Sequence, residues 1–505
     1  MKLKKYLGVA AGFHDAAVSL VDSAGRILFA GHSERYSRVK SDANISAGLI
    51  QELNGHDIDV IAYYERPWLK QLRRWYSGEG VQWNQLSARR ILEQQLRPHC
   101  DLPARSTPVK SYSHHLCHAA AGFQTSPFDR ATVVVIDAIG EWDTTTIWGA
   151  EYRDGRAHYR KLWSQHYPHS IGLFYSAVTA RLGLRPMDEE YITMGMAALS
   201  SPPNMTYLMK QYLVNNENEI TFQENLHTGL PADWLGPFSS ASFSDEMIAA
   251  GAQKLAENLI YNVMCRARDL GWSENLVYGG GVALNCVANR SLGDYFDRIW
   301  IMPCPGDAGN SLGSAALAMG GPLDWRDPYL GHNIPGAYPT NQLLDHLLSD
   351  RVVGVASGRA EFGPRALGNR SLLADPRGLD MQQRMNQLKQ RQSFRPFAPA
   401  ILAELADEYF VMPPRWSQSP YMQTVAQCRA PELYPAIVHV DGTSRVQTVN
   451  QDSGSGLREL LEKWYVWTGC PMLLNTSLNI RGEPMVNNIQ DAQRFEQLYD
   501  INVCS

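Results

Sequence analysis

The sequence is short of paired cysteines. Its eight cysteines are scattered over 505 residues, and no two of them form a CxxC pair. A disulfide framework needs closely spaced cysteines in a small chain, and a zinc ribbon needs CxxC pairs, so neither is predicted. Isolated thiols of this kind are typical of a reducing compartment, and we expect a cytoplasmic protein.

Long apolar runs are also missing. No stretch approaches the roughly 20 uncharged apolar residues of a membrane-spanning helix. Three lysines (Lys2, Lys4 and Lys5) before the run Tyr6–Phe13 imitate a signal peptide, but the run is short and stops at His14-Asp15. We therefore interpret the run as a first β-strand and expect no membrane partner.

The chain has no excess of positive charge, because its formal net charge is −5. Proteins that bind nucleic acid or anionic lipid usually carry a basic field that gathers these polyanions. A nucleic-acid partner is therefore disfavoured.

Two segments of the chain open with the same pattern of short strands. The first comprises Tyr6–Gly12, Ala16–Val21 and Ile27–Ala30, and the second comprises Thr132–Gly140, Thr144–Tyr152 and His158–Trp163. Helical patterns follow in the second segment at Leu173–Leu182 and Ser244–Leu270. A duplicated mixed α/β lobe is predicted, with the cleft between the lobes as a natural nucleotide site, although similar hairpins occur in many α/β proteins.

A third unit follows a stretch rich in Pro, Gly and Asp between Gly320 and Gln342, which is typical of a linker. Beyond it, the segment Gly358–Arg395 is rich in arginine, whose planar guanidinium suits phosphate or carboxylate ligands. We expect a first lobe at residues 1–125, a second lobe at 126–330, a linker at 331–349 and a third domain at 350–505.

Two histidines and two aspartates form a candidate metal site. His114 and His118 lie one helical turn apart in an alanine-rich stretch, so their imidazoles point the same way. Asp137 ends an apolar strand, and Asp307 lies in a glycine-containing turn before another alanine-rich helix. Such a donor set suits iron, zinc or similar metals. Taken singly, each residue is also explained by a structural role in packing, capping or a turn.

A glycine-rich turn at Tyr278–Asn285 follows a second apolar strand. Gly280 and Gly281 allow a ligand to approach the backbone without a clash with a Cβ atom. Asn285 is placed to hold the ribose or base of a nucleotide. A tight connection between a strand and a helix would use the same glycines.

The turn after the first strand contains a candidate general base, His14, because an imidazole titrates near neutral pH. Lys40 lies further along in a basic stretch with Arg35 and Arg38 that can face a phosphate. Solvated surface side chains would give the same pattern.

These stretches together resemble the O-carbamoyltransferases of antibiotic, toxin and nodulation-factor biosynthesis. The resemblance covers nearly the whole chain and rests on residues 14–15, 114–118, 137–145, 168–176, 194–197, 280–286, 306–309, 361–371, 394–399, 441–447 and 475–479. It implies an α/β fold in which duplicated actin-like ATPase lobes of the RNase H-like type are followed by a YrdC-like domain.

The resemblance also implies a two-step reaction. The YrdC-like domain would join carbamoyl phosphate and ATP, with Mg²⁺, into carbamoyl-adenylate, and the metal site would pass the carbamoyl group to a hydroxyl of a small natural-product alcohol. Connected cavities would protect this fragile intermediate from water.

By the same resemblance, the metal held by His114, His118, Asp137 and Asp307 would be iron. His14 would remove the proton of the acceptor hydroxyl, and Lys40 would contact the nucleotide phosphate. The remaining assignments place phosphates at Arg365, Lys389, Arg395 and Arg445, with Ser477 at the carbamoyl group and Asn475 at the nucleotide.

Other functions fit the sequence less well. A threonylcarbamoyl-type transferase acting on tRNA needs a basic docking face that the charge does not supply. A hydrogenase-maturation relative carries acylphosphatase and zinc-finger segments that neither the length nor the cysteine spacing allows. A metallopeptidase would need the glutamate of HExxH, and an actin-type scaffold would not need an arginine-rich third unit.

Overall fold

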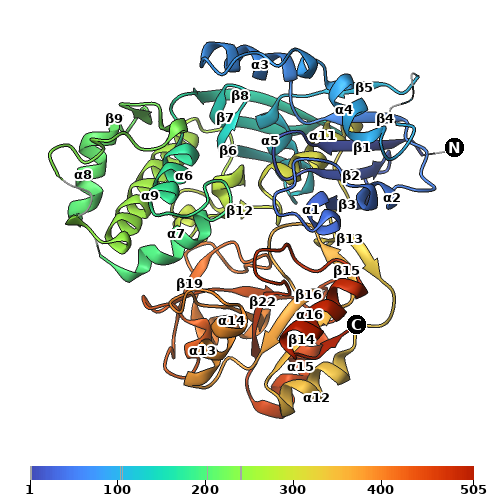
Figure 1. Cartoon of the computed structure of the whole chain (residues 1–505), viewed down its shortest axis with the longest axis vertical. Coiled ribbons are helices and arrows are strands. Elements are labelled where there is room, and N and C mark those ends of the chain that lie inside the picture. The colour runs from blue at the N-terminus through green and yellow to red at the C-terminus, as the bar shows by residue number, and fades with distance from the viewer. Residues whose placement is uncertain (1–2, 103, 105, 202, 239–241) are drawn as a thin grey trace.

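The computed structural model describes the whole chain except residues 1–2, 103, 105, 202 and 239–241. Two lobes lie side by side in the upper half of Figure 1, and a third unit, coloured orange to red, packs below them. Each lobe is built on a five-stranded sheet, and the third unit is built on a six-stranded sheet.

The first lobe has the strand order β3-β2-β1-β4-β5. β1 pairs with β2 in antiparallel fashion across the loop of residues 11–16, and it pairs with β4 in parallel after a helical connection. The strands are β1 (Lys5–Ala10), β2 (Ala17–Asp22), β3 (Ile27–His32), β4 (Val60–Tyr63) and β5 (Val109–Ser111). The helices are α1 (Ser33–Ser37), α2 (Ala47–Gln51), α3 (Pro67–Tyr76), α4 (Ala88–Leu96) and α5 (His114–Thr125).

The second lobe has the corresponding order β8-β7-β6-β11-β12. Its strands are β6 (Arg130–Gly140), β7 (Asp143–Arg153), β8 (Arg156–His166), β11 (Asn275–Gly279) and β12 (Arg298–Trp300), with a small hairpin of β9 (Val214–Asn216) and β10 (Thr221–Phe222). Its helices are α6 (Ile171–Arg181), α7 (Glu190–Met196), α8 (Pro203–Leu213), α9 (Asp245–Asp269), α10 (Cys286–Asn289) and α11 (Asn310–Met319).

The two sheets therefore repeat one topology, in which three antiparallel strands are followed by two parallel ones. This confirms the duplicated α/β lobes of the actin-like type that the sequence predicts. The predicted strands and the helices at 173–182 and 244–270 are confirmed within a few residues at their ends.

The lobes exchange one helix each. Helix α5 follows the strands of the first lobe but packs against β6 and β11 of the second, whereas α11 follows the strands of the second lobe and packs on β1 and β2 of the first. The two helices also pack against each other. This exchange brings the amino-terminal ends of α5 and α11 to the base of the cleft between the lobes.

The third unit is a mixed α/β domain. Its main sheet contains β21 (Gln447–Val449), β17 (Ala398–Leu402), β22 (Met472–Ser477), β16 (Arg370–Ala374), β14 (Val352–Ala356) and β23 (Val503–Cys504), in that order. A side sheet contains β18 (Phe410–Val411), β19 (Val425–Cys428) and β20 (Thr443–Arg445), and β13 (Tyr329–Ile334) pairs with β15 (Gly358–Glu361). The helices are α12 (Thr340–Ser349), α13 (Leu379–Leu388), α14 (Ala406–Tyr409), α15 (Leu457–Thr468) and α16 (Ile489–Tyr499).

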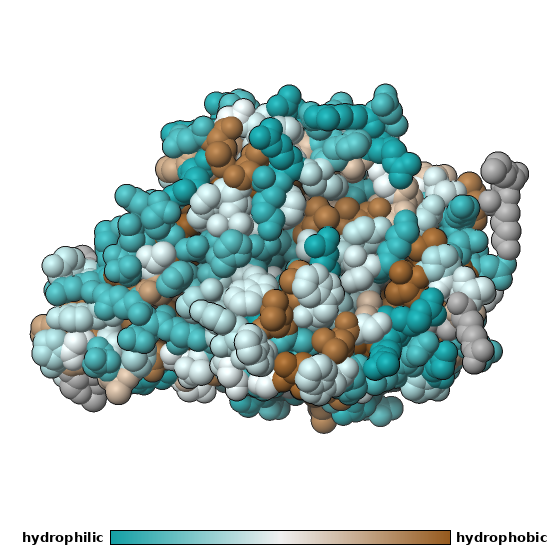
Figure 2. Space-filling model, turned by 90° about the horizontal axis from the view of Figure 1, so that it is seen from above, coloured by the Kyte–Doolittle hydropathy of each residue, from teal (hydrophilic) through white to brown (hydrophobic). Residues whose placement is uncertain are grey.

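The segment predicted as a linker, 331–349, contains the end of β13 and all of α12. The amphipathic α12 buries Leu343, Leu344 and Leu347 against β14 and α15 of the third unit. Among the described residues, no helix is long and apolar enough to cross a membrane. Figure 2, which views the face that carries α3, shows hydrophobic residues only in small separate groups.

Candidate metal centre and basic cavity

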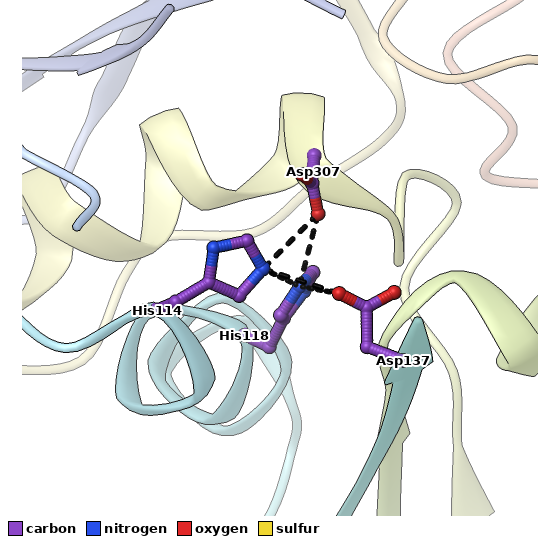
Figure 3. Close-up of side chains that lie close together, drawn as sticks. All are labelled: His114, His118, Asp137 and Asp307. Carbon is purple, nitrogen blue, oxygen red and sulfur yellow. Dashed lines mark hydrogen bonds and ion pairs between the residues drawn. The ribbon is translucent and has the colours of Figure 1, made fainter. Parts of the chain in front are cut away.

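Four side chains from three separate segments converge at the base of the cleft. His114 and His118 come from the first turns of α5, Asp137 from β6, and Asp307 from the turn just before α11 (Figure 3). All four residues are buried. The structure thus brings together the four residues that the sequence proposes as metal ligands.

The four side chains present their donor atoms to one point. The Nε2 atoms of His114 and His118 lie 3.1 Å apart. Oδ1 of Asp307 is 3.2 and 3.3 Å from these two nitrogens, and Oδ2 of Asp137 is 3.2 and 3.6 Å from them. One donor atom from each residue lies within 4.8 Å of all the others, so the cluster could hold a metal ion.

The chemistry of this donor set fits a divalent cation. Two imidazole nitrogens and two carboxylate oxygens form a site of the borderline-to-hard kind that first-row transition metals occupy. Burial opposes ionisation of Asp137, yet its hydrogen bond with His114 and the nearby imidazole of His118 hold the pKa of its carboxyl well below the usual range. An ionised carboxylate in this position is what a cation requires.

His14 lies beside this cluster. Its Nε2 is 3.5 Å from Oδ2 of Asp307, and its Nδ1 is 2.9 Å from Oδ2 of Asp15. Burial lowers the pKa of the imidazole, but the carboxylates of Asp307 and Asp15 raise it further, to about 9. A cation bound by Asp307 would oppose the effect of that carboxylate.

A cavity of about 1000 Å³ extends from this cluster into the third unit. His14, Asp137 and Asp307 line one part of it, and basic side chains of the third unit line another. The predicted site residues among its lining are His14, Lys40, Asp137, Gly281, Asn285, Asp307, Arg365, Lys389, Arg395, Arg445, Asn475 and Ser477. Residues that lie more than 450 positions apart in the chain thus share one space.

Cations crowd the part of the cavity that the third unit forms. Burial and the neighbouring Arg445 lower the pKa of Arg365 to about 9. Burial and the cations of Arg391 and Arg395 likewise lower the pKa of Lys389. Positive groups that repel one another in a half-buried space form a site for an anion with several negative oxygens.

Polar groups of strand β22 and of the residues just after it complete this part of the cavity. Nζ of Lys389 donates to the carbonyl oxygens of Ser477 and Asn479 at 2.8 and 2.9 Å. Asn475 donates from Nδ2 to the carbonyl of Ala366 at 3.1 Å, while its buried Oδ1 has no hydrogen-bond partner among the described residues. The Oδ1 atom is therefore an acceptor still to be satisfied.

The second lobe contributes the glycine-rich turn, but its two glycines differ. The backbone N–H of Gly281 donates to Oδ1 of Asp137 at 3.1 Å, and Gly281 lines the cavity. Gly280 is not among the lining residues. Its φ of +87° and a virtual Cβ only 2.2 Å from the carbonyl oxygen of Ile136 show that a close backbone approach requires glycine there.

Two further predicted residues face the cavity from either side. Asn285 exchanges hydrogen bonds of 3.0 and 3.1 Å with the side chain of Gln253. Nζ of Lys40, in the first lobe, lies 3.5 Å from the carboxylate of Asp188 in the second. Lys40 therefore bridges the lobes at the edge of the cavity.

Two residues near the site were not singled out from the sequence as site residues. Arg391 lines the cavity beside Arg395. It belongs to the arginine-rich segment, and membership of that segment could have identified it from the sequence. Glu65 contacts His114 from behind the metal cluster at 3.6 Å. In the sequence, Glu65 is distinguished only by its place just after an apolar strand. Acidic residues are common at such places in α/β proteins, so this position alone does not predict a site residue.

Comparison with known proteins identifies both parts of the chain. Residues 5–316 match the model of the carbamoyltransferase N-terminus, and residues 344–504 match that of the carbamoyltransferase C-terminus. Among solved structures, full-length HypF in the phosphate- and nucleotide-bound form is similar over 63% of this chain and 55% of that chain, with 13% identity and a TM-score of 0.38.

Relatives at higher identity cover nearly the whole chain. The uncharacterized protein sll1178 of Synechocystis is 33% identical over 97% of this chain and 93% of its own length. Nodulation protein NolNO of Sinorhizobium fredii is 31% identical over 95% of this chain and 76% of its own length, and nodulation protein U of the same species is 28% identical over 93% and 92%. The chain belongs to the carbamoyltransferase family and is a transferase enzyme.

Proposed function

We propose that this carbamoyltransferase converts carbamoyl phosphate and ATP, as its Mg²⁺ complex, into carbamoyl-adenylate in the third unit, and then transfers the carbamoyl group to a hydroxyl of a small natural-product alcohol with release of AMP. In the first step one water cleaves carbamoyl phosphate into carbamate and phosphate, and the carbamate oxygen attacks the α-phosphorus of ATP with release of pyrophosphate. The observation that carries the proposal is the single cavity. It is lined at once by the basic residues of the third unit and by His14, Asp137 and Asp307 of the lobes, the last two of which belong to the candidate metal cluster.

The third unit supplies what the first step needs. Arg365, Arg395 and Arg445 are proposed to hold the phosphates of ATP and carbamoyl phosphate, since arginine can donate two parallel hydrogen bonds to one phosphate. Lys389 and Ser477 are proposed to lie at the carbamoyl phosphate, and the unpartnered Oδ1 of Asn475 accepts a hydrogen bond from the nucleotide. The resemblance of this unit to YrdC-like domains supports the same step.

The lobes supply what the second step needs. His14 is proposed to take the proton of the acceptor hydroxyl, and Lys40, Gly281 and Asn285 are proposed to hold the nucleotide, with Gly280 forming the turn that places Gly281. His114, His118, Asp137 and Asp307 would hold a divalent metal, for which we propose Fe²⁺, and a metal here would act as a Lewis acid toward the phosphate of the adenylate. A shared cavity keeps a water-sensitive intermediate away from bulk solvent between the steps.

A labelling experiment tests the proposal. Purified protein is incubated with ATP, [¹⁴C]carbamoyl phosphate and MgCl₂ without an acceptor, and carbamoyl-adenylate and pyrophosphate are separated by chromatography. Both should appear, and a panel of small alcohols should then give carbamoylated products. Modification of a protein or tRNA instead of any small alcohol would overturn the choice of acceptor, and pyrophosphate without a carbamoylated nucleotide would overturn the intermediate.

A further inference from the structure

Glu65 is a buried carboxylate that follows strand β4 and lies behind the candidate metal centre. Its Oε1 is 3.6 Å from Nδ1 of His114. This nitrogen points away from the other three candidate ligands in Figure 3 and has no hydrogen-bond partner among the described residues. Glu65 is only 4% exposed, so water does not compete strongly for its charge.

The position of this carboxylate matters for the tautomer of His114. A neutral imidazole that binds a cation through Nε2 must carry its proton on Nδ1. A distance of 3.6 Å is longer than a hydrogen bond, so Glu65 acts through its charge at this spacing. A negative oxygen near Nδ1 favours a proton there, because a lone pair on Nδ1 would be repelled.

Glu65 is itself fixed from several directions. Nζ of Lys70 in α3 lies 2.9 Å from Oε2 and 3.3 Å from Oε1 of Glu65. The hydroxyl of Ser111 donates to the carbonyl oxygen of Glu65. On the other side of the imidazole, a Cβ at Gly140 would come within 2.5 Å of Cδ2 of His114, so the ring has little room to turn.

The charges of these groups favour a doubly charged cation. Three carboxylates contact His114, namely those of Asp137, Asp307 and Glu65. Lys70 neutralises one of these three charges. The remaining two negative charges, buried together, are balanced by one divalent ion.

We propose that Glu65 is a positioning residue that holds His114 in the orientation and tautomer that binds a divalent cation, with Lys70 as its counter-charge. The proposal rests on the metal centre of the proposed function. It assigns opposite electrostatic effects to the two partners of one ion pair. Loss of Glu65 removes a negative charge from the site, and loss of Lys70 removes a positive one.

Cobalt(II) titration of the full chain tests this proposal without an activity assay. Cobalt binding is followed by visible absorption and by competition with a chelator. Glu65→Ala should weaken Co²⁺ binding by about 10- to 100-fold, the range typical of residues that support a metal ligand. The absorption bands should keep their positions, since all four direct ligands remain. Glu65→Gln, which keeps the size of the side chain, should fall between the wild type and Glu65→Ala.

The paired variant separates a charge effect from a structural one. Lys70→Met should leave Co²⁺ affinity unchanged or increase it, because the site becomes more negative. A loss as large as that of Glu65→Ala would mean that the ion pair only holds the fold together and would overturn the proposal. Glu79→Gln, which loses a carboxylate just after α3 that pairs with Arg74, is the matched control and should bind as the wild type does.

The titration also distinguishes two failures. If the wild type binds no Co²⁺, or His114→Ala binds it equally well, the metal centre itself is wrong. If the wild type binds and Glu65→Ala binds equally tightly with the same spectrum, only the role of Glu65 is overturned. Thermal unfolding of each variant before cobalt is added identifies variants that are unfolded, and Glu65→Gln then decides the outcome.

Discussion

Arg38 in the first lobe donates a hydrogen bond of 2.7 Å from Nη1 to the carbonyl oxygen of Met485 in the third unit. Its Nη2 donates to the carbonyl of the preceding proline at 2.9 Å. Met485 lines the shared cavity, so this contact ties a wall of the cavity in the third unit to a side chain of the first lobe.

Arg38→Met should therefore loosen the cavity wall and let the intermediate escape to water. We expect more pyrophosphate to be released per carbamoylated product, while formation of the adenylate continues. The ratio of pyrophosphate to product in a steady-state assay measures this uncoupling. Arg26→Met, which removes an arginine that pairs with Asp22 in a surface hairpin, should leave the ratio unchanged.

The two ends of the cavity should be separable by substitution. Arg365→Ala removes a side chain proposed to bind phosphate and should abolish adenylate formation, whereas His14→Ala should spare adenylate formation and block transfer to the alcohol. Single-turnover assays with and without acceptor measure the two steps. Equal loss of both steps in both variants would contradict a division of labour between the units.

Repulsion among the arginines of the third unit should lower the free energy of unfolding of the protein until an anion binds between them. Arg365 lies in a half-buried cluster with Arg445 and Arg395, and removal from water together with their charges lowers its pKa. Arg365→Met should therefore stabilise the ligand-free protein by about 0.5–2 kcal/mol, as loss of a strained functional group often does. Thermal unfolding checks this.

The same variant should lose its response to anions. Pyrophosphate at 100 times its Kd should stabilise the wild type by about 2.7 kcal/mol and Arg365→Met by much less. Arg384→Met, which removes an exposed arginine of α13, is the control and should change neither value. If the ligand-free Arg365→Met protein were less stable than the wild type, repulsion between Arg365 and the neighbouring arginines would not be the dominant effect of this side chain.

Glu141 gives a pH-dependent prediction. Its side chain is buried, and burial raises the pKa of its carboxyl from 4.5 to about 7. The folded state then binds this proton more tightly than the unfolded state does. Stability should therefore fall as pH rises from about 4.5 to about 7 and stay reduced above that.

Glu141→Gln should remove this dependence. It keeps an oxygen for the backbone N–H of Arg66, which donates to Oε1 of Glu141 at 2.6 Å. Urea unfolding in EDTA should show the variant to be more stable than the wild type by on the order of 2–3 kcal/mol at pH 8, with little difference near pH 4.5. Glu93→Gln, in α4, is the control, and its free energy of unfolding should match that of the wild type at every pH. A difference between Glu141→Gln and the wild type that is the same at every pH would contradict the titration of Glu141.

Much of the fold was predictable because local signals are strong where strands alternate with tight turns. The hairpins of both lobes and the long helix α9 follow directly from apolar periodicity and glycine-containing turns. The helix exchange was not predictable, since nothing in the sequence of α11 says that it packs on β1 of the other lobe. Such pairing is decided by complementary surfaces that meet only in the folded chain.

The candidate site was likewise predictable from the sequence only in part. His114 and His118 were identifiable because four-residue spacing on a helix places two side chains on one face. The close approach of Asp137 and Asp307 to them depends on the packing of α5 and α11, and the sequence provided it only through resemblance to a family. Glu65 was not predicted as a site residue because its partner His114 lies 49 positions away in the chain and the two meet only through tertiary packing.

The matching strand orders of the two lobes have an evolutionary consequence. Duplication of one ancestral unit yields two sheets of this kind, and it places equivalent first strands, β1 and β6, on either side of the same space. Today the turn after β1 presents His14 and the end of β6 presents Asp137. A chain with two like scaffolds can carry a different chemical group on each of them without a change in either sheet.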